Sequence, residues 1–179
     1  MMSKMVSTAS AFGRGWFSPA VPARPVAQAT VWGSPPGMSA YAIVDPDEIG
    51  DVYEGSDVPG EFRPLTDALG CGQLAVTLIR VPPHSDFEQG TGHYHDEVEE
   101  LYLVTRGTLT MRFADDIHEV TAGSAVRVAA RTPRSHRNEG DEPVELWAIS
   151  RQVGRSDATK LDDFWAASPD AEQHRGSAG

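Results

Sequence analysis

Cysteine, long apolar runs and basic residues are scarce in this chain of 179 residues, and each shortage excludes a class of protein. Cys71 is the only cysteine, so the chain forms neither an internal disulfide nor a zinc site built on thiolates. No run of about 18 apolar residues occurs, which excludes a helix that spans a bilayer. The net charge is −11, whereas nucleic acids and anionic membrane surfaces attract proteins with a basic face. We therefore expect neither nucleic acid nor a membrane as a partner.

The charge is unevenly distributed along the chain. Residues 1–44 contain no Asp or Glu, whereas the rest of the chain holds all 26 acidic residues against 12 basic ones, a net charge of −14. The segment 1–37 is rich in Ala, Ser, Pro and Gly and has no apolar period, so it buries too little surface to offset the entropy of ordering it. We predict a disordered extension over 1–37, a folded domain over 38–168 and a disordered tail over 169–179.

Strand patterns dominate from about residue 72 onward. Short runs rich in β-branched residues alternate with turn signals such as Arg106-Gly107 and Asp115-Asp116. Strands at such regular short spacing are typical of antiparallel sandwiches and barrels. We expect strands within 72–83, 100–113, 112–120, 124–130, 133–138 and 142–150.

The segment after the last predicted strand has the pattern of a short helix. Ser156 can cap the first turn of a helix over 156–168, and a proline follows directly. Leu161, Phe164 and Trp165 fall at i, i+3 and i+4, which gives the helix one apolar face. We therefore expect an all-β domain with a short C-terminal helix that packs against the sheet or against a second subunit.

The candidate functional residues lie close together in the sequence. His93 and His95 are two apart on a predicted strand, so their imidazoles point the same way and can converge on one ion. On the next strand Glu100 shares an inward face with Tyr102 and Val104. Two histidines and a carboxylate suit Fe(II), and they also accept Mn(II), Ni(II) or Zn(II). The alternative is a pair of exposed histidines at a sheet edge.

This order of residues resembles the first motif of the cupin superfamily, G-x5-HxH-x4-E-x6-G. His93, His95, Glu100 and Gly107 occupy the corresponding places, while Phe87 stands where the leading glycine is expected.

The second motif of the superfamily, G-x5-P-x-G-x2-H-x3-N, is matched in part. Gly123 and Asn138 are in register, but Ala129 and Arg131 replace the proline and the glycine. Arg134 stands at the position of the histidine, which in the family is usually the fourth metal ligand. Across about residues 72–150, the resemblance implies an antiparallel double-stranded β-helix, a jelly-roll-like barrel with a metal inside that is commonly dimeric.

Arg134 cannot replace the missing ligand, because a guanidinium has only donors and stays protonated. Three arrangements remain open. His136, which shares a strand face with Arg134, bends in as the fourth ligand. Alternatively, His93, His95 and Glu100 hold the ion alone and Arg134 binds an anionic substrate. In the third arrangement no metal binds, and Arg134 pairs with Glu100.

Together these features predict a small-molecule metalloenzyme with one divalent ion. An Fe(II) centre favours a dioxygenase, whereas a redox-inert ion acts as a Lewis acid in an isomerase, a cyclase or a decarboxylase. The substrate would be an anionic or carbonyl compound, with Arg134 as its anion-binding group and Tyr102 as a proton donor. The rival is a non-catalytic, metal-free module that binds a small ligand. We further expect a cytoplasmic homodimer.

Overall fold

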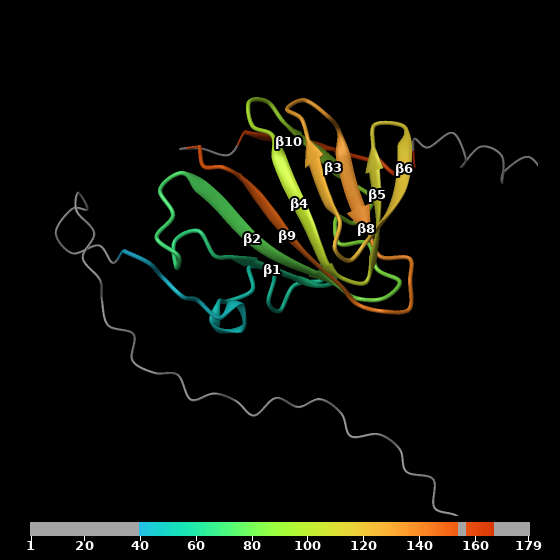
Figure 1. Ribbon diagram of the computed structural model, residues 1–179. Coiled ribbons are helices and arrows are strands. Elements are labelled where there is room, and N and C mark those ends of the chain that lie inside the picture. The colour runs from blue at the N-terminus through green and yellow to red at the C-terminus, as the bar shows by residue number, and fades with distance from the viewer. Residues whose placement is uncertain (1–39, 154–156, 167–179) are drawn as a thin grey trace, which may run out of the picture. The chain divides into compact units, whose positions relative to one another are not determined.

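The computed structural model describes residues 40–153 and 157–166. Two five-stranded antiparallel sheets form the framework of this part of the chain (Figure 1). The first sheet has the order β1-β2-β9-β4-β7 and consists of β1 (Glu61–Pro64), β2 (Leu74–Val81), β9 (Val144–Arg151), β4 (Glu100–Arg106) and β7 (Ala125–Val128). The second has the order β10-β3-β8-β5-β6 and consists of β10 (Ala158–Leu161), β3 (Gly92–His95), β8 (Arg134–Arg137), β5 (Thr108–Phe113) and β6 (Asp116–Thr121).

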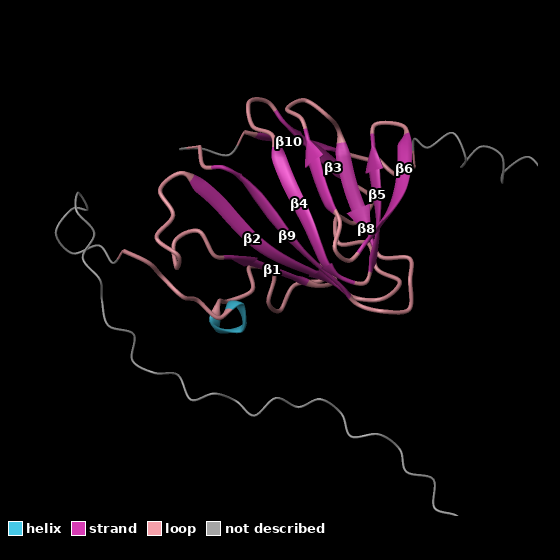
Figure 2. Cartoon of the chain, viewed as in Figure 1, coloured by secondary structure: helices cyan, strands magenta, loops and turns pink. Residues whose placement is uncertain are grey.

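The chain crosses between the two sheets repeatedly. It passes from β3 to β4, from β4 to β5, from β6 to β7, and then alternates through β8, β9 and β10. This alternation is the double-stranded β-helix, or jelly roll, that the sequence predicts. The 3-10 helix η1 (Pro46–Glu48) is short (Figure 2). No helix among the described residues is long and apolar enough to cross a membrane.

The core lies between the two sheets. Alternation along each strand turns every second residue inward, and the inward residues form one buried apolar cluster. Its members are Ile79, Val81, Phe87, Tyr102, Val104, Leu109, Met111, Val120, Val128, Val144, Leu146 and Ala148. Tyr102 lies in this cluster, so the inward face that carries Glu100 and Tyr102 is the face that the sequence predicts.

The outer face of the first sheet is also apolar. Val76 and Leu78 of β2 are buried there beneath Leu65, and Trp147 and Ile149 of β9 pack against them. Strands β2 and β9 are thus apolar on both faces, which explains why they read in the sequence as near-continuous apolar runs.

Every strand expected from the sequence is present, and one expectation is wrong. Residues 158–161 form the strand β10, and 162–166 form turns, where the sequence predicted a helix. Strand β10 pairs with the whole of β3, and these ladder hydrogen bonds outweigh the helical pattern of a short segment. Ser156, the expected cap, and the predicted extension and tail lie outside the described residues.

Gly107 makes the connection between β4 and β5 possible. Its φ of +73° lies in the left-handed region, and a Cβ there would come within 2.7 Å of the carbonyl oxygen of Pro143. Only glycine meets both requirements without strain. The turn fixes where β4 begins and ends, and therefore where Glu100 lies.

Candidate metal centre

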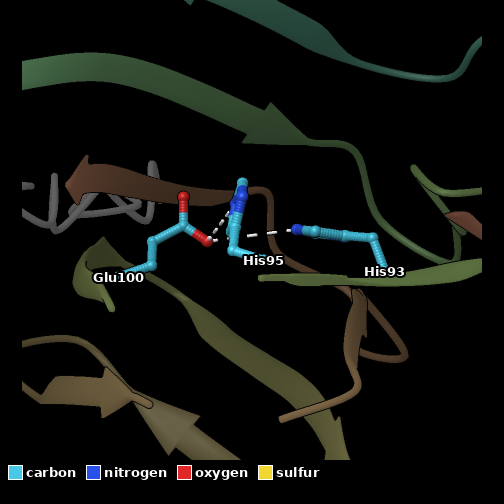
Figure 3. Close-up of side chains that lie close together, drawn as sticks. All are labelled: His93, His95 and Glu100. Atoms are coloured by element: carbon cyan, nitrogen blue, oxygen red, sulfur yellow. Dashed lines mark ion pairs between the residues drawn. The ribbon is translucent and has the colours of Figure 1, made fainter. Parts of the chain in front are cut away.

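Two neighbouring segments bring three ligand atoms together. His93 and His95 lie on β3 with their side chains on one face, and Glu100 is the first residue of β4. The Nε2 atoms of His93 and His95 lie 3.9 Å and 3.7 Å from the Oε2 atom of Glu100. Figure 3 shows both imidazoles directed at this carboxylate. All three ligand atoms lie within 4.8 Å of one another.

Each imidazole is held from behind by a second carboxylate. The Nδ1 atom of His93 lies 3.1 Å from Oε2 of Glu88, and Nδ1 of His95 lies 2.7 Å from Oδ1 of Asp157. A carboxylate at Nδ1 holds a proton there, so Nε2 is the nitrogen that would bind a metal ion after losing its own proton. Carboxylate-backed histidines of this kind are characteristic of metal ligands.

Asp157 belongs to a C-terminal segment that packs against the second sheet. Its Oδ2 atom also accepts hydrogen bonds from the backbone N–H groups of Glu97 and Val98, at 3.1 Å and 3.3 Å. These bonds fix the turn between β3 and β4. The segment ends with Trp165, whose indole N–H donates to Ser135 of β8 at 2.8 Å.

Arg134 occupies the remaining side of Glu100. Its Nη2 atom lies 2.5 Å from Oε2 of Glu100, the oxygen that faces both imidazoles. The hydroxyl of Tyr102 donates to the same oxygen and accepts from Nε of Arg134 at 3.4 Å. The structure thus contains the Arg134–Glu100 pair of the third predicted arrangement. Nη1 of Arg134 is buried without a hydrogen-bond partner, and so retains a donor for the anion of the second arrangement.

The pKa shifts follow from this packing. Burial raises the pKa of Glu100, but the imidazoles, the guanidinium and the phenol lower it more, so the net shift is strongly downward. Burial likewise opposes the charged forms of Glu88 and His93. Their contacts with oppositely charged neighbours still lower the pKa of Glu88 to about 2 and raise that of His93 to about 9. Burial and the nearby Glu100 raise the pKa of Tyr102, which stays a neutral donor.

His136 lies outside the ligand cluster, contrary to its predicted role as a fourth ligand. Its ring stacks on Phe87, with centroids 5.7 Å apart and planes 17° apart. Its Nδ1 atom lies 3.0 Å from Oε1 of Glu88, although the angles do not make a hydrogen bond. His136 therefore shares the carboxylate of Glu88 with His93 and is not part of the cluster of ligand atoms.

A cavity of about 520 Å³ adjoins the cluster. Its apolar lining residues include Tyr53, Val58, Phe62, Ile79, Phe87 and Ala148. Its polar lining residues include Glu88, His93, Glu100, Tyr102, His136 and Lys160. An apolar pocket with a few convergent polar groups is the usual form of a small-molecule site. A larger hollow of about 710 Å³ also touches Glu100, but no histidine lines it.

The donor set fits a divalent metal ion. Ligand atoms about 2.0–2.1 Å from one ion lie roughly 3.0–3.5 Å apart, so the observed separations of 3.7 Å and 3.9 Å need only a small closure. Nitrogen and carboxylate donors suit Fe(II), Mn(II), Ni(II) or Zn(II). Arg134 opposes binding, since it places a positive charge on the same carboxylate oxygen.

The fold and the site together define a double-stranded β-helix with a two-histidine, one-carboxylate cluster inside. Residues 77–150 match the family model for the cupin domain, so this part of the chain is a cupin domain. No curated protein sequence matches the chain significantly.

Solved structures support the same fold. A cupin protein from Bacteroides fragilis superposes with a TM-score of 0.53 and 20% identity, covering 65% of this chain and 88% of its own. A sugar phosphate isomerase of the cupin superfamily from Silicibacter pomeroyi gives 0.51 and 25%, covering 63% and 76%. An uncharacterized protein with a double-stranded β-helix domain from Klebsiella pneumoniae gives 0.54 and 15%, covering 67% and 96%.

The sequence identified the three ligand candidates but not the residues behind them. Glu88 lies in the loop before β3, and Asp157 lies 62 residues beyond His95 in a segment expected to be helical. No spacing pattern in the sequence connects Glu88 or Asp157 with the two histidines. The resemblance gave one indirect signal, since Phe87, which replaces the motif's glycine, marks the wall of the cavity.

Proposed function

We propose that this cupin is a small-molecule enzyme whose centre binds one divalent metal ion through His93, His95 and Glu100. The proposal rests on one observation: two carboxylate-backed imidazoles converge on Glu100 beside a cavity. A bound metal would supply either O2 chemistry, as in a dioxygenase, or Lewis-acid catalysis, as in an isomerase, cyclase or decarboxylase. Fe(II) is the first candidate, followed by Mn(II), Ni(II) and Zn(II).

The residues around the ligand cluster have separate roles in this proposal. Arg134 has one buried nitrogen without a partner, and this donor is suited to an anionic group of the substrate. Tyr102 stays protonated and orients Glu100 by donating to it. When a substrate oxygen competes for that hydrogen bond, the same phenol becomes its proton donor. The aromatic wall excludes water from the apolar part of the substrate.

A metal-free module that binds a small ligand is the second candidate. The buried pair between Arg134 and Glu100 favours it, because the guanidinium already neutralises the carboxylate that a metal would need. The two candidates differ in metal stoichiometry, which can be measured directly.

The test is elemental analysis of the purified protein after reconstitution with Fe(II), Mn(II), Ni(II) and Zn(II). We expect about one ion per chain for one of these metals. Glu100→Gln removes a ligand oxygen and should lower the affinity at least about tenfold. Glu99→Gln, at the exposed neighbouring position, should leave it unchanged. Stoichiometry far below one for every metal would favour the binding module.

Three further expectations belong to this proposal. The acidic chain is expected to have neither nucleic acid nor a membrane as its partner. We also propose a homodimer and a cytoplasmic location. Light scattering of the purified protein measures the first of these two directly.

A further inference from the structure

Buried polar atoms without hydrogen-bond partners are concentrated in one place. Among the described residues, five buried side-chain nitrogen or oxygen atoms have none, and four of them belong to Glu88, Arg134 and His136. Such atoms are costly to bury. Glu88 Oε1 and His136 Nδ1 face each other at 3.0 Å, and Arg134 does not line the cavity. Nε2 of His136 is therefore the atom that a group in the cavity would satisfy.

His136 lines the cavity, and its Nε2 atom has neither a hydrogen bond nor an ion-pair partner. Its side chain is about 3% exposed, and neither ring nitrogen makes a hydrogen bond. Because the carboxylate of Glu88 lies 3.0 Å from Nδ1, the proton of the neutral ring is favoured on that nitrogen. Nε2 then presents its lone pair, which accepts a hydrogen bond and so requires a donor in the ligand.

The rings around His136 also define a plane. The planes of His136 and Phe87 differ by 17°, and those of Phe87 and Phe62 by 11°. The Nε2 lone pair lies in the plane of the imidazole, so a hydroxyl bound there lies in that plane as well. Phe87 and Phe62 present nearly parallel faces, so a flat ring that stacks on either of them would lie nearly in the imidazole plane, with its hydroxyl directed at Nε2.

We propose that the cavity recognises a planar, unsaturated ring that carries a hydroxyl group, such as a phenol or an enol, and that His136 accepts its hydroxyl proton in a hydrogen bond. This inference deepens the proposed function, on which it rests for the idea that a substrate enters the cavity. It assigns His136 to substrate recognition rather than to metal binding.

The test is the binding of three small probes to the full-length protein. Phenol combines the flat ring and the hydroxyl, toluene lacks the hydroxyl, and cyclohexanol lacks the flat ring. Titration calorimetry should show phenol binding at least about tenfold more tightly than either control, which is the usual effect of one satisfied hydrogen bond. Equal affinities, or no binding of phenol, would overturn the proposal.

Matched variants assign the selectivity to a residue. His136→Phe keeps the flat ring and removes the acceptor, so the preference for phenol over toluene should fall to about onefold. His118→Phe makes the same change at an exposed histidine and should keep the preference. A His136→Phe variant that still prefers phenol would contradict the role of His136. If that variant does not fold, 15N NMR of the unaltered protein tests the contact instead. Phenol should shift the Nε2 resonance of His136, and an unchanged resonance would contradict the proposal.

Two further outcomes separate this inference from the metal proposal. The titrations are run on protein treated with a chelator and on protein reloaded with Zn(II). Selective binding of phenol by a protein that takes up no metal would sustain the inference and refute the metal centre. Tighter binding of benzoate than of phenol would show that the ligand's head group is anionic, and would overturn the hydroxyl assignment.

Discussion

The contact between Arg134 and Glu100 affects whether the candidate centre can bind a metal ion. A single oxygen of Glu100 faces both histidines, the guanidinium and the phenol of Tyr102. A metal ion bound there would therefore compete with Arg134 for that oxygen, and the positive charge of the guanidinium would lower the metal affinity. The sequence located this competition, because arginine at a ligand position is visible without a structure.

Replacing Arg134 should raise the affinity of the site for a metal ion. Arg134→His removes the competing charge and adds a possible ligand, so we expect metal affinity to rise at least about tenfold. Arg127→His is the matched control, because Arg127 pairs with Glu99 at 2.9 Å on the exposed surface. Competition titration with a metal indicator measures both. Equal affinities for Arg134→His and the unaltered protein would show that Arg134 does not limit binding.

The contacts of Glu88 and His93 predict a pH window for the metal-free protein. His136 and His93 lower the folded pKa of Glu88 to about 2 from its ordinary 4.5, so the stabilising effect is complete above pH 4.5 and is lost as the pH falls toward 2. Glu100 and Glu88 raise the folded pKa of His93 to about 9 from its ordinary 6.5, so the effect is complete below pH 6.5 and is lost as the pH rises through 9. These contacts together therefore contribute most between pH 4.5 and 6.5.

Urea unfolding in the presence of a chelator checks this window. Glu88→Gln should lower the free energy of unfolding most between pH 4.5 and 6.5, and the difference should shrink toward pH 2 and above pH 9. A difference that stays constant across this range would contradict the assignment of the two pKa shifts.

Among the elements, β10 contributes more to the site than its sequence suggested. Its pairing with β3 places Asp157 behind His95. Gly92, at the start of β3, allows the C-terminal segment to pack closely against this strand, since a Cβ there would come within 2.7 Å of the ring of Phe164. The family model ends at residue 150, so this support is supplied by the part of the chain beyond the match.

Asp157→Asn should loosen the centre without removing a ligand. The amide no longer holds the Nδ1 proton of His95 as a carboxylate does, and we expect metal affinity to fall about 10- to 100-fold. Asp162→Asn, at an exposed position of the same segment, is the control and should have no effect. Calorimetric titration with Zn(II) measures both variants. Equal effects would mean that the segment acts through general stability rather than through His95.

The elements show where sequence reasoning succeeds and where it stops. Alternation and turn residues located strands such as β2, β4 and β9, because each strand carries its own pattern of burial. The helix expected over 156–168 was wrong because its short apolar pattern fits a strand equally well once β3 offers a free edge. Asp157 and Glu88 were missed for a related reason: their partners are chosen by the fold and leave no spacing to read.

For the whole molecule, the described strands all lie between Glu61 and Leu161. A chain that starts at Met38 should therefore unfold at the same temperature and bind metal with the same affinity as the full chain. Thermal unfolding and metal titration of both chains test this expectation. A clear loss of stability in the shorter chain would show that residues 1–37 belong to the folded domain.

The position of β10 near the end of the chain also means that the candidate metal centre is completed late during synthesis. The three ligand candidates have all been made by residue 100, but the carboxylate that fixes His95 comes 62 residues after that histidine. A chain emerging from the ribosome therefore exposes its histidines well before they are held in place. In the proposed metal centre, loading would therefore follow synthesis of the whole domain, because a chain that stops short of β10 carries His93, His95 and Glu100 without Asp157 behind His95.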